Sequence, residues 1–153
     1  MRKITLITYL LLTTYANLNA QTTKETLSTV KISISQKTGD NSYDEEYTLT
    51  TKYDENILEF KTRADGTFSK FTTKKITKKY VVGEASGNYA FYNIEKEQFY
   101  YIDYFMSRYL VNGYGKDYSS LKESSLQIMK MLKEGKTQKD AIAHLIEQSS
   151  YDF

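Results

Sequence analysis

Acidic side chains beside an aromatic-rich stretch are the residues of this chain that could perform chemistry. Glu95, Glu97, Asp103 and Asp117 lie in or next to that stretch. Hydrolysis of a glycosidic bond needs two carboxyl groups, one to protonate the leaving oxygen and one to act as base or nucleophile, and their separation decides the outcome. Because the sequence does not fix that separation, we assign no catalytic residue and keep a carboxylate-dependent glycoside hydrolase as an alternative hypothesis.

The composition argues against a metal centre and against histidine-based catalysis. The chain has one histidine, His144, and no cysteine. Structural zinc sites are built mainly from cysteine and histidine, and a catalytic histidine needs a nucleophile and an orienting acid. We therefore expect His144 to be an ordinary packing or surface residue, and we expect no metal and no cofactor.

Aromatic residues are the most conspicuous feature, since most of the 15 tyrosines lie between residues 80 and 118. Within 99–106, positions of both parities are aromatic or apolar, so a strand there would present rings to both sides of a sheet. Helices that follow in the chain could cover the second side, which would make the rings core. The alternative is a recognition surface, because rigid rings give a large contact area at low entropic cost.

The recognition hypothesis names a specific set of residues for ligand or partner binding. The expected partner is a protein, a glycan or a small apolar ligand, with the charged members of the set providing polar contacts. The predicted site consists of Tyr89, Tyr92, Tyr100, Tyr101, Asp103, Tyr104 and Arg108.

A run of lysines at 73–80 is the chain's basic cluster. It is typical either of an edge strand, where lysines oppose edge-to-edge association, or of a strip that binds an anionic polymer. The chain has 21 Lys+Arg against 19 Asp+Glu, and removal of Arg2 and Lys3 with an N-terminal signal leaves 19 against 19. A neutral protein favours the edge strand, and we do not expect nucleic acid as a partner.

The N-terminus has the three parts of a secretory signal peptide. Arg2 and Lys3 are followed by an apolar segment over 4–12 and a polar segment of mainly small residues that ends at Ala20. Leu18 departs from the usual small residue two positions earlier, so cleavage after Ala16 is the alternative. We expect residues 1–20 to be removed and residues 21–153 to be a single globular domain, secreted or periplasmic, without a stable membrane anchor.

Alternating apolar and polar residues predict antiparallel strands from about Thr29 to Phe105. Asp65-Gly66 is the strongest tight-turn signal, and the opposite parity of Phe68 and Phe71 suggests a bulge in the strand that follows it. Residues 89–94 and 99–105 are read as a hairpin, although 94–111 also shows helical spacing. Six or seven strands are expected.

Two helices are predicted after the sheet. Ser120 and Glu123 match a capping box for a helix over 121–134, Gly135 is suited to its C-terminal turn, and Thr137 with Asp140 caps a second helix that reaches about Gln148. The fold class is therefore α+β, a mostly antiparallel sheet followed by two C-terminal helices. The alternative is a small lipocalin-like β-barrel with a C-terminal helix.

These features favour an exported, non-catalytic binding or interaction protein that uses a tyrosine-rich sheet surface. A carrier of a small apolar ligand in a barrel cavity is the second hypothesis, and the glycoside hydrolase is the third.

Overall fold

The computed structural model describes residues 24–32, 45–63 and 65–151. The predicted signal segment and its cleavage site lie outside these residues. The described chain forms a sheet followed by two helices, and its elements are β1 Lys24–Ile32, β2 Glu45–Tyr53, β3 Ile57–Lys61, β4 Ser69–Ile76, β5 Tyr80–Ala85, β6 Asn88–Asn93, β7 Gln98–Phe105, β8 Arg108–Gly115, α2 Tyr118–Lys133 and α3 Gln138–Tyr151.

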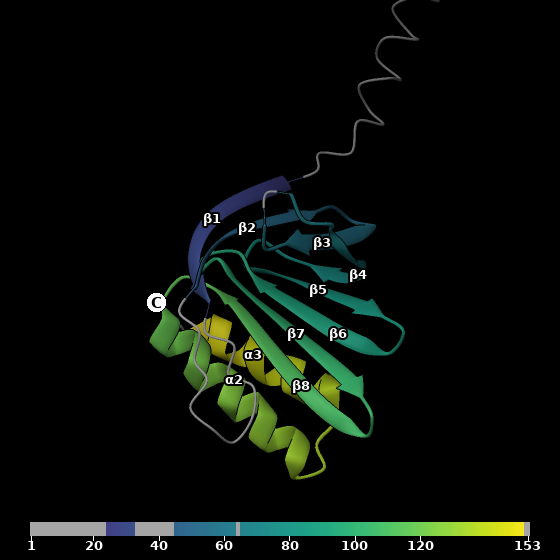
Figure 1. Cartoon of the computed structure of the whole chain (residues 1–153). Coiled ribbons are helices and arrows are strands. Elements are labelled where there is room, and N and C mark those ends of the chain that lie inside the picture. Colours follow the sequence, from purple (N-terminus) through teal and green to yellow (C-terminus); the bar gives the residue numbers. More distant parts are fainter. Residues whose placement is uncertain (1–23, 33–44, 64, 152–153) are drawn as a thin grey trace, which may run out of the picture.

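Each strand pairs antiparallel with the next one, so the eight strands follow chain order from β1 to β8. The sheet curls into a half-barrel, with the two helices on one side of it (Figure 1). This arrangement confirms the α+β class. Among the described residues β1 and β8 share no backbone ladder, although β1 bends toward the carboxyl-terminal end of β8.

The sheet extends one strand beyond the predicted end at Phe105. The β7–β8 turn is made by Met106 and Ser107, whose φ angles are 50° and 61°. Two positive φ angles characterise the tight turn that joins hairpin strands, but such turns usually carry glycine or asparagine. Met106 and Ser107 gave no such signal, and so β8 was not predicted. The region 94–111 consists of strands and turns, not a helix.

An aromatic cluster fills the concave face of the sheet. Phe60 on β3 lies with its ring centroid 4.2 Å from that of Phe99 on β7, and Phe60 also lies 5.4 Å from Tyr114 on β8. Rings from opposite ends of the sheet therefore meet across the concave face. This inner cluster comprises Leu49, Tyr53, Leu58, Phe60, Phe71, Val81, Ala90, Tyr92 and Phe99.

The helices cover the other face of β5, β6 and β7 (Figure 1). Because side chains alternate along a strand, neighbours such as Phe91 and Tyr92 belong to different clusters. Both faces of the sheet are thus buried in its central part. The outer cluster comprises Tyr80, Val82, Phe91, Tyr100, Ile102, Leu121, Ile128, Leu132, Ala141, Ile142 and Leu145.

The N-terminus of α2 differs from the prediction. Asp117, not Ser120, caps α2, and its carboxylate accepts a hydrogen bond from the Ser120 amide at 3.3 Å. Ser120 therefore lies inside the first turn. Gly135 has a φ of 88° after α2, as expected for a C-terminal glycine.

The predicted capping pair of α3 is confirmed. The Thr137 amide donates to Asp140 Oδ2 at 2.8 Å, and the Asp140 amide donates to Thr137 Oγ1 at 3.1 Å. The Thr137 hydroxyl also donates to Asp140 Oδ2, at 2.9 Å. The hydrogen bonds that the Thr137 amide and hydroxyl donate favour the ionised carboxylate and lower the pKa of Asp140.

The lysine run lies partly on β4, an interior strand, and partly in the turn that leads to β5, which corrects the edge-strand interpretation. β4 pairs with both β3 and β5, and a bulge occurs between Thr73 and Lys75. Pairing with β3 ends at Thr72, however, while pairing with β5 continues to Ile76. The lysine-rich half of β4 thus extends past its shorter neighbour and has one paired strand.

Candidate functional site

Two of the predicted site residues belong to the core. Tyr92 is fully buried in the inner cluster, and Tyr100 is buried in the outer cluster beneath the helices. The Tyr100 hydroxyl donates to Gln98 Oε1 at 3.0 Å, and burial raises the pKa of Tyr100 to about 12. Neither ring is available to a partner at the surface.

A polar network holds two further predicted residues. Asn88 Nδ2 donates to Asp103 Oδ1 at 3.2 Å, while Gln138 Nε2 donates to Asn88 Oδ1 at 3.1 Å. The Tyr89 amide in turn donates to Gln138 Oε1 at 2.8 Å. These bonds connect β6 and β7 to the start of α3, so Asp103 serves the packing of the helix layer.

Tyr101 is half-buried on the concave side. Its ring lies 5.2 Å from that of Phe71, edge to face. Burial, followed by the nearby Asp103 carboxylate, raises the pKa of Tyr101, so the hydroxyl stays protonated.

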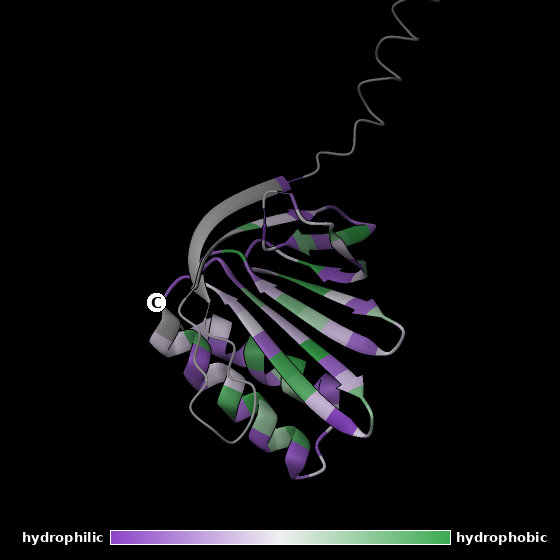
Figure 2. Cartoon of the chain, in the orientation of Figure 1, coloured by the Kyte–Doolittle hydropathy of each residue, from purple (hydrophilic) through white to green (hydrophobic). Residues whose placement is uncertain are grey.

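The remaining two predicted residues, Tyr104 and Arg108, are exposed together at the end of the β7–β8 hairpin. The Tyr104 ring packs against Tyr109 across the strand pair with centroids 4.7 Å apart. Tyr104 is 51% exposed, Phe105 62% and Met106 79%. Figure 2 shows hydrophobic colour at this tip, with the hydrophilic start of β8 beside it. The hairpin therefore ends in an apolar tip in contact with solvent.

A groove of about 690 Å³ runs between β8 and α2 and begins at this tip. We call it the β8–α2 groove. The wall on the sheet side includes the predicted residues Tyr104 and Arg108, and the wall on the helix side is formed by α2. Its lining residues are Tyr104, Ser107, Arg108, Tyr109, Leu110, Val111, Ser125, Leu126, Met129, Leu132 and Lys133.

Gly113 marks where the helix comes closest to β8. A Cβ atom at this position would lie 2.6 Å from Ser125 Oγ and 3.1 Å from Leu121 Cγ. Gly113 itself is not among the lining residues. The helix therefore lies directly on the strand at Gly113, while an open groove separates the two elements along Arg108–Val111.

The groove combines apolar walls with positive charge. Leu126, on the helix wall, is 51% exposed. Of the described residues that line the groove, Arg108 and Lys133 are charged, and none is an aspartate or a glutamate. This combination suits an apolar group that carries a negative charge.

The helix wall was not predicted as part of a site. Leu126 and Met129 are spaced three residues apart, as expected for neighbours on one side of a helix. That spacing is also typical of a buried helix face, and so it carried no functional signal. The exposure of Leu126 distinguishes a groove wall from a buried helix face.

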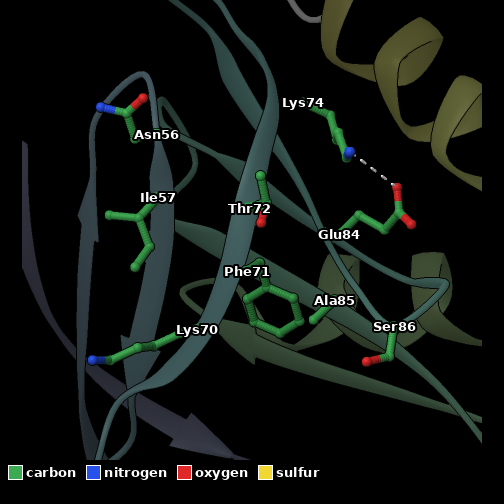
Figure 3. A pocket seen from close by; sticks show the side chains of 9 residues that line it. All are labelled: Asn56, Ile57, Lys70, Phe71, Thr72, Lys74, Glu84, Ala85 and Ser86. Atoms are coloured by element: carbon green, nitrogen blue, oxygen red, sulfur yellow. Dashed lines mark ion pairs between the residues drawn. The ribbon is translucent and has the colours of Figure 1, made fainter.

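A second, more polar hollow of about 370 Å³ lies over β3, β4 and β5 (Figure 3). Lys74 and Glu84 face each other across it with Nζ and Oε2 3.6 Å apart. The ion pair neutralises Glu84, the single carboxylate among the described residues that line this hollow. These residues therefore provide neither the paired acids of a hydrolase nor the apolar walls of the β8–α2 groove.

The other acids and the histidine have structural surroundings. Glu97 forms an ion pair with Lys116, and Asp117 caps α2. Nε2 of His144 is buried and has no hydrogen-bond partner among the residues that the structure describes. In the described part of the chain, no three histidine or acidic side chains come together as they would around a metal ion.

The comparisons with known proteins assign no family to this half-barrel. No protein-family model, no curated protein and no solved structure matches the chain. None of the described helices has the length and apolar character needed to cross a membrane.

Proposed function

We propose that this protein is a non-catalytic binding protein that holds its partner in the β8–α2 groove. The observation that carries the proposal is the groove itself, in which exposed apolar side chains on both walls adjoin Arg108 and Lys133. Exposed apolar surface around a concave site is typical of ligand and partner binding, because its burial is the main source of affinity. Of the predicted site, Tyr104 and Arg108 belong to this proposal.

We further propose that the protein acts outside the cytoplasm after residues 1–20 are removed. The support is the order of a positive, an apolar and a polar segment at the N-terminus. N-terminal sequencing of the mature protein would distinguish cleavage after Ala20 from cleavage after Ala16, and an intact Met1 would contradict export by this route.

The two other hypotheses have less support from the described residues. Aromatic rings occupy the concave face of the sheet, so an apolar cargo would be carried in the β8–α2 groove and not inside the half-barrel. For a hydrolase, Glu97 and Asp117 already have an ion-pair and a capping role.

A fluorescent probe, 8-anilinonaphthalene-1-sulfonate, tests the proposed function, since it joins apolar rings to a negative charge. We expect one probe molecule to bind per folded protein, and Leu126→Ser to weaken binding. Loss of contact with the leucine costs about 1–2 kcal/mol, equivalent to about a 5- to 30-fold loss of affinity. Tyr104→Ser should act in the same direction.

Ile76→Ser provides the matched control, because Ile76 is 38% exposed and does not line the groove. Its affinity for the probe should equal that of the parent protein. Absence of probe binding to the folded protein would contradict the proposal. An equal loss of probe affinity in Ile76→Ser and Leu126→Ser would also contradict it. Near-ultraviolet circular dichroism of each variant excludes binding to a molten globule, which binds the probe but loses this signal.

A further inference from the structure

The sheet-side wall of the groove is an edge of the sheet. Among the described residues, β8 is paired with β7 and with no other strand. An edge strand presents backbone N–H and C=O groups that can pair with another extended chain. β1 approaches β8 at its carboxyl-terminal end, which is the end away from the hairpin tip (Figure 1).

The hairpin register identifies which backbone groups point outward. Phe105 and Arg108 flank the two-residue turn, and in such a hairpin the flanking pair exchanges both of its hydrogen bonds. Hydrogen-bonded and non-hydrogen-bonded pairs then alternate along the strands. The N–H and C=O groups of Tyr109 and Val111 therefore face the free edge, and no described residue pairs with them.

The lining of the groove shows that this edge is accessible. Arg108, Tyr109, Leu110 and Val111 all line it, although successive side chains of a strand point to opposite faces. A hollow that touches four successive residues runs along the edge of the strand. An occupant would therefore meet outward-facing backbone groups on one side and the apolar wall of α2 on the other.

We propose that the occupant is an extended segment of another polypeptide, with alternating apolar and acidic residues, which adds a ninth strand to the sheet along β8. This inference rests on the proposed function and specifies its partner class. Backbone pairing with Tyr109 and Val111 would provide a general contribution to affinity. Apolar side chains would face α2 and pack on Leu126 and Met129, and acidic ones, which alternation directs to the other face of the sheet, would lie near Arg108.

The length and the charge of the groove both support a short acidic segment as its occupant. Arg108 to Asn112 corresponds to about 13 Å of strand, so a segment of about five residues fills the open edge before the helix meets the strand at Gly113. A second copy of this chain is disfavoured, because pairing of two β8 edges would bring both copies of Arg108 and Lys133 into one interface. An acidic segment meets complementary charge instead.

Synthetic peptides test the proposal on the full mature chain. The probe is a fluorescein-labelled heptapeptide of alternating valine and glutamate, and binding is followed by fluorescence anisotropy. A valine–lysine peptide should bind at least about tenfold more weakly because it repels the cations of the groove. A valine–glutamate peptide that is N-methylated at every second residue should also bind about tenfold more weakly, because it cannot complete the ladder.

Amide hydrogen exchange locates the contact. The peptide should slow exchange at Tyr109 and Val111, whereas Leu110, which already pairs with β7, is the internal control. Val111→Pro removes one outward donor without removing a β7–β8 hydrogen bond, and should weaken binding of the valine–glutamate peptide. The N-methylated peptide provides the same test if this variant does not fold.

Each outcome bears on one of the two proposals. Probe binding without peptide binding, or peptide binding that N-methylation leaves unchanged, would overturn strand addition and leave the groove as a site. Failure of both the probe and the peptide would overturn both proposals. Protection of Tyr109 and Val111 that grows with protein concentration in the absence of peptide would overturn the heterologous partner and indicate a second copy.

Discussion

Replacement of Gly115 by alanine should destabilise the protein strongly. This residue ends β8, two positions before Asp117, which caps α2. Its φ is 151°, a conformation that side chains disfavour. An added Cβ would lie 2.5 Å from the Glu97 carbonyl oxygen and 2.7 Å from Gln98 Cα. Both are backbone atoms, and Gln98 is fixed opposite Gly115 in the β7–β8 ladder.

The magnitude follows from these two effects. The unfavourable backbone conformation costs about 1–3 kcal/mol, and overpacking against backbone costs a further 1–3 kcal/mol, about 2–6 kcal/mol together. This is a large part of the roughly 5–15 kcal/mol that stabilises a typical domain. Urea unfolding followed by circular dichroism measures the loss as a lower midpoint.

Gly87→Ala is the matched control for that experiment. Gly87 also has a positive φ, 82°, but nothing lies within 4 Å of an added Cβ. Its replacement should cost about 1–2 kcal/mol, from the backbone conformation alone. Equal losses of stability in the two variants would show that contact of an added Cβ with Glu97 and Gln98 does not destabilise the protein, and would refute the reasoning.

Four further substitutions test the roles assigned to individual residues. Tyr92→Ala should lower the free energy of unfolding by about 3–5 kcal/mol because the ring is buried in the inner cluster, whereas the exposed Tyr104→Ala should cost under about 1 kcal/mol in the same urea assay. Burial raises the pKa of Tyr100 from 10.0 to about 12, so the stabilisation that its protonated hydroxyl gives the fold is present below pH 10 and is lost as the pH rises through about 12. Tyr100→Phe should therefore lose less stability than the parent over that range in alkaline urea titrations. The pKa of Asp140 is lowered from 3.8, so its contribution is present above that pH and is lost as the pH falls through the folded-state pKa. The stability difference between the parent and Asp140→Asn should therefore shrink in acid, and a difference independent of pH would contradict the capping role.

Local signals were sufficient for the C-terminus of α2, the N-terminus of α3 and most strands. Thr137 and Asp140 are three residues apart and cap each other directly, so sequence spacing alone identifies the pair. Asp117 was missed because Ser120 and Glu123 offered a second capping pattern three residues later. β8 was missed because Met106 and Ser107 adopt positive φ without a glycine or asparagine to indicate it.

The division of the tyrosines between core and surface depends on contacts between residues far apart in the chain. Alternation places Tyr92 and Tyr100 on opposite faces, but only the curl of the sheet and the position of α2 bury both. In the same way, Leu126 faces a groove because α2 touches β8 at Gly113 and leaves an open groove along Arg108–Val111. The crossing of a helix over a strand is not encoded in any short pattern, so the sequence identified Tyr104 and Arg108 without their partners on the helix.

The most direct test of the binding site is a map of backbone amide chemical shifts during titration with 8-anilinonaphthalene-1-sulfonate. If the β8–α2 groove is the site, the shifts will concentrate at Tyr109, Val111, Leu126 and Met129, with saturation at one probe per chain. Shifts that concentrate instead at Phe71 and Glu84, around the hollow of Figure 3, or that spread without saturation, would contradict it.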